Sequence, residues 1–185
     1  MKLYYTFLLR IASFKFLIFW LIIYASVLIL FMVPLQGLIV NGSESGLIDL
    51  MPFFNKESFY QALENYGEVG RAAYLQYWYY DFLYPFVYMV LMYTLIGLMF
   101  NRIKLPTEKG TFWMYVPFFA VLIDFGENLS FLSIISAFPE QNPMLFWMAF
   151  TLSSLKWSAI YAVVIRLFLT VFKKLLFTLD FFHFV

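Results

Sequence analysis

Four long apolar runs dominate this chain and limit it to folds in which apolar helices lie side by side. They cover about residues 16–36, 77–100, 112–138 and 146–170. Each is near or above the ~20 residues that a helix needs to cross a bilayer. In lipid, backbone groups must be satisfied within the segment, so such runs form helices. The sequence therefore predicts an all-α integral membrane protein, a four-transmembrane-helix bundle in one domain of residues 1–185.

The composition is typical of a protein whose main solvent is lipid. Apolar residues make up 64% and charged residues 12% of the chain, about half the charged share of an ordinary soluble domain. The net charge of +1 argues against electrostatic binding of nucleic acid. No cysteine is present, and the lone histidine, His183, lies beside the C-terminus among phenylalanines. We therefore expect no metal site and no cofactor.

Residues 41–73 form the longest polar segment, and they contain one amphipathic stretch. Asn55 is a predicted N-cap of a short helix through Tyr66. Phe59, Leu63 and Tyr66 fall on one face of that helix, as the helical period requires. We expect this loop to lie outside the cytoplasm, with its helix in the membrane interface.

Basic residues flank the apolar runs unevenly, which predicts the orientation. One side has Lys56 and Arg71 against six acids, which are Glu44, Asp49, Glu57, Glu64, Glu68 and Glu140. The other side holds nine basic residues, which are Lys2, Arg10, Lys15, Arg102, Lys104, Lys109, Arg166, Lys173 and Lys174. We therefore expect a multi-pass protein with both the N- and C-termini in the cytoplasm.

Ionisable side chains interrupt three of the apolar runs. The third run contains Asp124, Glu127 and Asn128, whose spacing places them on one helix face. Asp81 lies in the second run and Lys156 in the fourth. Charged residues inside a membrane are costly, so they face the bundle interior and usually mark a functional site. These five residues are our candidates for binding a ligand or a proton.

The depth of each candidate follows from the helical rise, counted from the cytoplasmic end of its run. Asp124 lies at ~17 Å, Glu127 and Lys156 at ~22 Å, and Asp81 at ~28 Å. Glu127 and Lys156 are therefore predicted to be level with each other. The four side chains would form a polar column through the outer half of the bundle.

Asp81 also has an unusual backbone environment. Pro85 follows four residues later and has no N–H, so the carbonyl of Asp81 lacks its intrahelical donor. Tyr84 and Tyr88 are on the same helix face as Asp81 and are further candidates, as hydrogen-bond donors to a ligand or a carboxylate. Together these groups predict a spot that favours a cation.

The charge balance separates two interpretations of this column. Three acids face one Lys, so full ionisation would leave a buried excess of two negative charges. A structural ion pair that only fixes helix packing is one interpretation. The other is a polar cavity in which the surplus carboxyl groups are protonated, solvated or paired with a cationic ligand.

Three functions remain open from the sequence. The first is binding or translocation of a proton or a small apolar or cationic ligand, with the lipid bilayer as the other partner. The second is a membrane-embedded enzyme that uses carboxyl acid/base pairs on an apolar, lipid-like substrate, as an isomerase would. The third is a structural or assembly subunit. The sequence leaves open an oligomer or a partner membrane subunit.

Overall fold

The structure, a computed structural model, describes residues 6, 12–40, 46–51, 53–103 and 107–182, without the side chains of 101–111, 170–171 and 173–182. In these ranges the chain is helical and has no strand. The elements are α2 (Phe14–Val27), the π-helical turn η1 (Leu28–Met32), α3 (Val33–Val40), the 3-10 turn η2 (Ile48–Leu50), α4 (Lys56–Asn65), α5 (Gly67–Ile103), α6 (Thr107–Ala137) and α7 (Pro143–Phe182). The predicted all-α class is confirmed.

Four of these helical stretches are long and apolar enough to cross a membrane. They are Phe14–Val40, which joins α2, η1 and α3, and then Gly67–Phe100, Phe112–Ala137 and Pro143–Leu169. The four predicted runs are therefore all helical.

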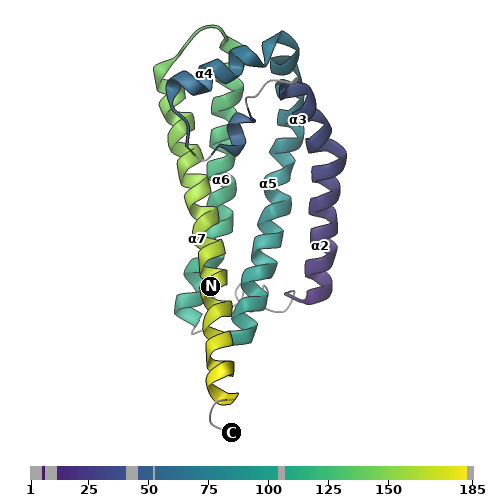
Figure 1. Ribbon diagram of the computed structural model, residues 1–185, viewed down its shortest axis with the longest axis vertical. Helices are drawn as coiled ribbons and strands as arrows, with labels where there is room; N and C mark the ends of the chain where they lie inside the picture. Colours follow the sequence, from purple (N-terminus) through teal and green to yellow (C-terminus); the bar gives the residue numbers. More distant parts are fainter. Residues whose placement is uncertain (1–5, 7–11, 41–45, 52, 104–106, 183–185) are drawn as a thin grey trace.

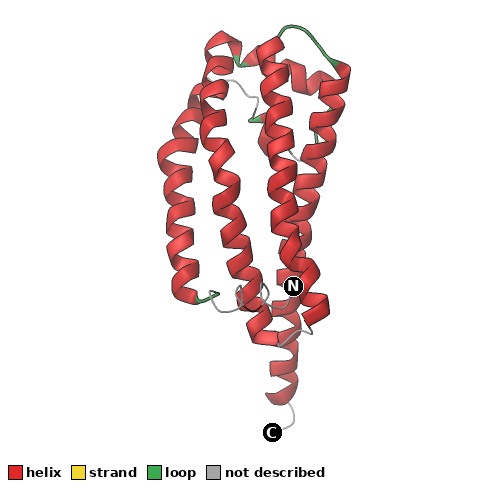
Figure 2. Ribbon diagram, turned by 180° about the vertical axis from the view of Figure 1, so that it is seen from behind, coloured by secondary structure: helices red, strands yellow, loops and turns green. Residues whose placement is uncertain are grey.

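The long helices stand side by side, as Figures 1 and 2 show from opposite sides. The α2–α3 stretch packs on α5, α5 packs on α6, and α6 packs on α7. Within the described part of the chain, α2 and α7 have no extensive contact with each other. Helix α2 begins at the end of the bundle where α7 finishes (Figure 1). Each long helix thus packs mainly on its neighbour in the chain. Among the described residues, the side of the bundle between α2 and α7 has no helix–helix interface.

The first stretch changes its helical register just before a proline. Pro34 has no N–H, so it cannot donate to the carbonyl four residues earlier. The chain forms the π turn η1 there, and the N–H of Val33 reaches the carbonyl of Leu28. Single π turns of this kind widen a helix locally. Leu28, Met32 and Val33 face a cavity that is described below.

Helix α4 begins at the predicted N-cap. The Asn55 side chain accepts from the Ser58 N–H at 2.7 Å, and the Ser58 hydroxyl accepts from the Asn55 N–H. Gly67, at φ 62°, then turns the chain directly into α5, because glycine adopts positive φ without strain. Helix α5 thus begins at Gly67, earlier than the predicted span beginning at Tyr77.

The apolar face of α4 covers one end of the bundle (Figure 1). Phe59 and Leu63 are fully buried, as their spacing predicts. The Phe59 ring packs on Phe131 of α6 and Phe146 of α7, with ring centroids 5.7 and 5.6 Å apart. This face therefore contacts the bundle core.

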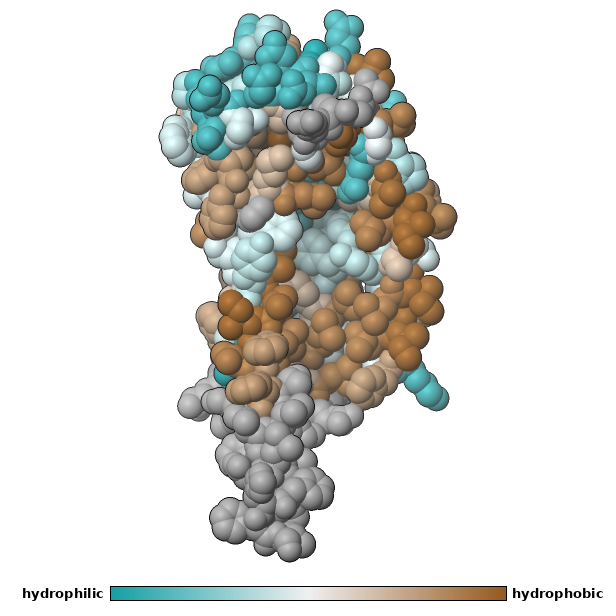
Figure 3. Space-filling model, in the orientation of Figure 1, coloured by the Kyte–Doolittle hydropathy of each residue, from teal (hydrophilic) through white to brown (hydrophobic). Residues whose placement is uncertain are grey.

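The outer surface of the long helices is apolar. Figure 3 shows a brown apolar band below a polar end, which is the end that carries α4. No residue of α2 is buried, and several of its large side chains are exposed, among them Ile18, Phe19 and Ile22. In the same view, weakly polar side chains lie in the middle of the band, between two apolar flanks.

Candidate functional site

A cavity of about 570 Å³ lies between α2–α3, α5 and α7, with α6 at its back. The polar side chains of its lining lie in the half nearer α4, where the apolar Met32, Val33 and Leu50 also line it. These polar side chains are Gln36, Asp49, Tyr77, Asp81, Tyr84, Tyr88, Asp124 and Lys156. The other half is lined by Leu91, Met92, Leu95, Ile160 and Val164. The cavity thus has polar groups in one half and an apolar lining in the other.

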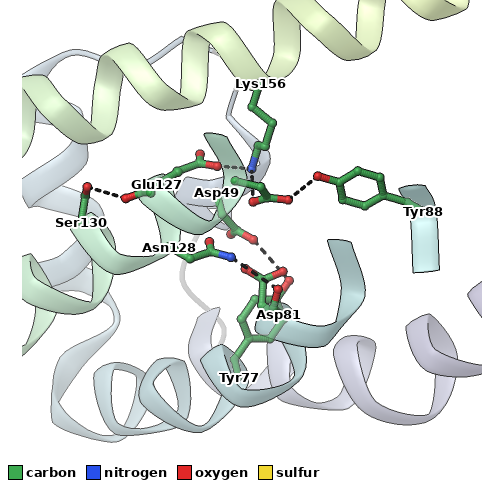
Figure 4. Close-up of polar contacts among 10 residues, drawn as sticks. Asp49, Tyr77, Asp81, Tyr88, Glu127, Asn128, Ser130 and Lys156 are labelled. Atoms are coloured by element: carbon green, nitrogen blue, oxygen red, sulfur yellow. Dashed lines mark hydrogen bonds and ion pairs between the residues drawn. The ribbon is translucent and has the colours of Figure 1, made fainter. Parts of the chain in front are cut away.

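Lys156 of α7 joins the two acids of α6. Its ammonium is 3.4 Å from Asp124 Oδ1 and also contacts Glu127 Oε2. All three side chains are buried. Figure 4 shows the Lys156 ammonium pointing at Glu127, which confirms that these two residues are level. The Tyr88 hydroxyl donates to Asp124 Oδ2 at 2.7 Å.

The carbonyl of Asp81 has a side-chain partner in place of the missing helical one. Asn128 Nδ2 donates to Asp81 O at 3.4 Å, a long hydrogen bond (Figure 4). The prediction that Pro85 leaves this carbonyl without an intrahelical donor is thereby supported. Among the described residues, no hydrogen bond or ion pair reaches the Asp81 carboxylate itself.

Asp49 joins this group, although from the sequence it was expected only among the acids of the outer loop. It lies in η2, and it is 4% exposed. The Tyr77 hydroxyl donates to its Oδ2 at 3.2 Å (Figure 4). The Tyr66 hydroxyl donates to the carbonyl of Gly46 and accepts from the N–H of Ile48, which holds the turn inside the bundle.

The signal for Asp49 was present in the sequence. It is the one acid in the otherwise apolar run Leu47–Met51, and an acid in such a run needs a buried partner. Burial raises the pKa of Asp49 above its ordinary value of 3.8, and the charge of Lys156 offsets part of this rise. With Asp49, four acids surround one lysine, so full ionisation would leave three uncompensated negative charges.

The predicted candidates occupy two positions relative to the cavity. Asp81, Tyr84, Tyr88, Asp124 and Lys156 line it. Glu127 and Asn128 are buried beside it and contact two of the lining residues, Lys156 and Asp81. Tyr84 packs on Tyr24 of α2, with ring centroids 5.1 Å apart. The structure brings all seven candidates together, and their role in binding stays a prediction. His183 lies outside the described residues.

No protein-family model, no curated protein and no solved structure matches this chain.

Proposed function

We propose that this protein spans a membrane four times and binds a small amphiphilic molecule in the cavity between α2 and α7. The observation that carries this proposal is the division of the cavity lining. Asp49, Asp81 and Lys156 line one half, and side chains such as Leu95 and Ile160 line the other. A molecule with a polar head and a hydrocarbon tail complements both halves, and pockets with a few polar groups in an apolar wall are the usual form of small-molecule sites.

The ligand would reach this cavity from the lipid. The α2–α7 side lacks a helix–helix interface, and the helices around it expose apolar side chains such as Ile22, Ile29 and Val164. An amphiphile dissolved in the bilayer therefore meets exposed apolar side chains on this side.

The proposed orientation puts both termini in the cytoplasm and α4 on the extracytoplasmic side, at the membrane interface. The uneven distribution of Lys and Arg supports it. The chain has no cysteine, so a thiol reagent labels only a cysteine that is introduced by mutation. We expect a membrane-impermeant maleimide to label Glu57→Cys in intact cells and Lys15→Cys only after permeabilisation. The opposite labelling would refute this orientation.

The binding proposal is tested by filling the apolar half of the cavity. The protein is placed in nanodiscs with a photoactivatable long-chain alcohol, and labelled peptides are mapped. We expect saturable labelling within residues 77–95 and 156–164. The variant Leu95→Trp overpacks the cavity, and a cost of ~1–3 kcal/mol corresponds to roughly a 5- to 150-fold loss of affinity.

The matched control is Leu122→Trp, because Leu122 is 48% exposed on the outer face of α6. It should leave the labelling unchanged. Labelling that does not saturate, or that Leu95→Trp does not reduce in a folded protein, would refute the binding proposal.

A second candidate function is proton transfer on the bound molecule. One observation favours it, which is the continuous chain from Tyr88 through Asp124 and Lys156 to Glu127. Interacting ionisable groups of this kind exchange protons readily. An isomerase would incorporate solvent deuterium at carbon when it is incubated in D2O with a membrane lipid extract. Mass spectrometry of the lipids checks this, and incorporation that Asp124→Asn leaves unchanged would count against it.

A further inference from the structure

The acids around the cavity fall into two pairs with different charge compensation. Asp124 and Glu127 share the ammonium of Lys156, which contacts both. Asp49 and Asp81 have no such partner, because Lys156 is the only basic side chain among the described residues that line the cavity. Arg71, at the start of α5, is engaged elsewhere. It donates to the carbonyl of Leu63 at 2.9 Å and stacks 4.3 Å from the Phe138 ring, at the end covered by α4.

The second pair has hydrogen-bonding capacity left over. Asp49 is 4% exposed, its Oδ2 accepts from Tyr77, and its Oδ1 has no hydrogen-bond partner in the described structure. The Asp81 carboxylate, one helical turn after Tyr77, has none either, although it is only half-buried. A buried carboxylate oxygen without a partner is costly, so a bound donor would stabilise this arrangement.

A metal ion complements this pair poorly. In the part of the chain that the structure describes, no three carboxylate or histidine groups come together closely enough to hold a metal ion. Hard divalent cations take six to eight oxygen ligands in proteins, several of them carboxylates. Aromatic rings also line the polar half, namely Tyr24, Tyr77, Tyr84, Tyr88 and Trp157. Rings around an acid are typical of sites for organic ammonium groups.

The rest of the cavity requires an elongated tail. From Asp81 to Leu95, both of which line it, α5 rises by ~21 Å at 1.5 Å per residue. On α7 the lining continues below Lys156 to Ile160 and Val164. A compact polar amine would leave this half unfilled, whereas a hydrocarbon chain would occupy it.

We propose that the molecule held by this cavity is an aliphatic amine, whose protonated nitrogen binds between Asp49 and Asp81 while its chain lies along Leu91, Leu95 and Ile160. This inference rests on the proposed function, since it names the class of ligand at the same site. The ammonium would supply the missing positive charge and donate to the two carboxylates. The Lys156 cluster would stay intact beside it.

Three amphiphiles that have the same dodecyl tail and differ in head group test the charge that the site prefers. Dodecylamine, dodecanol and dodecanoate each compete with the photoactivatable alcohol in nanodiscs that contain the full chain. Close charge pairs at binding sites contribute enough for about a tenfold or larger difference. We expect dodecylamine to displace the label at a concentration about tenfold below that of dodecanol, and dodecanoate to compete worst. Dodecyltrimethylammonium, which has no N–H, should be weaker than dodecylamine.

The variants Asp49→Asn and Asp81→Asn should each bring the amine-to-alcohol ratio toward one, while Glu140→Gln, at an exposed acid outside the cavity, should not. The wild-type ratio alone decides the inference if either Asn variant fails to fold. Saturable labelling with equal potency of amine and alcohol would overturn the amine and leave the binding proposal standing. Absence of saturable labelling would overturn both.

Discussion

The two pairs of acids at the centre of the bundle differ in what balances their charge. Asp124 and Glu127 lie one turn apart on α6 and share the Lys156 ammonium. Asp49 and Asp81 come from η2 and α5, and neither forms an ion pair with a basic side chain of the described residues. Through Lys156, the first pair connects α6 to α7 without a ligand. We therefore propose that the second pair takes up a proton or a ligand, whereas the structural interpretation of the charged column describes the contacts of the first pair.

The two pairs also differ in the backbone that carries them. The first pair lies on a helix where residues three apart face the same way. The second pair depends on irregular features. Asp49 lies in a short turn held by Tyr66, and Asp81 precedes Pro85 by one turn, with its carbonyl bound by Asn128. Irregular backbone of this kind is tolerated where the protein buries it and supplies partners for its polar groups.

The largest expected effect comes from removing the cation of the first pair. Lys156→Met leaves Asp124 and Glu127 buried without compensation, and breaking a buried ion pair costs about 3–5 kcal/mol. Unfolding in detergent, followed by circular dichroism against added SDS, measures the loss. The control Lys56→Met removes an exposed lysine of α4 and should change the stability little.

The double variant Lys156→Met with Glu127→Gln should recover much of that loss, because one of the two uncompensated charges is removed with its partner. If the single variant is as stable as the wild type, the ion pair of Lys156 with the first pair does not stabilise the packing of α6 on α7. The comparison between the two pairs would then fail.

Two tyrosines allow a smaller and more direct comparison. Tyr88 donates to Asp124 at 2.7 Å, and Tyr77 donates to Asp49 at 3.2 Å. Hydrogen bonds to charged groups contribute about 1.5–3 kcal/mol, and those to neutral groups about 0.5–1.5 kcal/mol. Asp124 forms an ion pair with Lys156, whereas burial raises the pKa of Asp49 above its ordinary value. Tyr88→Phe should therefore destabilise the protein more than Tyr77→Phe.

Tyr79→Phe is the matched control, since Tyr79 is 68% exposed and its change should be close to zero. The same SDS titration measures all three variants. Equal losses for Tyr88→Phe and Tyr77→Phe would mean that the two pairs carry similar charge.

The sequence predicted the first pair well because that pair follows helical geometry. A rise of 1.5 Å per residue placed Lys156 level with Glu127, and the contact between them confirms it. The carbonyl of Asp81 was also predicted to need another donor, because the missing N–H of Pro85 is a local property. Its partner Asn128 follows from tertiary packing, and helical phase could only place that side chain on the inner face.

Asp49 could not be placed in the same way. No periodicity applies to a three-residue turn, and its burial depends on Tyr66 and Tyr77, which are distant in sequence. The same reason explains α4. Its N-cap and apolar face were readable at Asn55 and Phe59, but the aromatic rings that cover this face come from α6 and α7. The local sequence pattern predicts where a helix lies and which of its faces is apolar. The residues that pack on that face depend on the tertiary structure of the whole chain.

The smallest expected effect concerns Asp49 and appears only as a dependence on pH. Because burial raises the pKa of Asp49 above 3.8, the folded state binds the proton more tightly than the unfolded state. The wild type should therefore be most stable below pH 3.8 with respect to this group, and it should lose that contribution as the pH rises through the raised pKa.

The side-chain amide in the variant Asp49→Asn cannot ionise, yet its oxygen can still accept from Tyr77. The variant should match the wild type at pH 4 and exceed it at pH 8, by up to ~1.4 kcal/mol for each unit by which the pKa is raised. Melting temperatures at the two values measure the difference, with Glu140→Gln as the control at an exposed acid. A variant that is less stable than the wild type at pH 8 would show that Asp49 is ionised and compensated, in which case the second pair resembles the first. If Asp49 is already compensated, added dodecylamine should stabilise the wild type no more than Asp49→Asn. If Asp49 is uncompensated, added dodecylamine should raise the melting temperature of the wild type more than that of the variant.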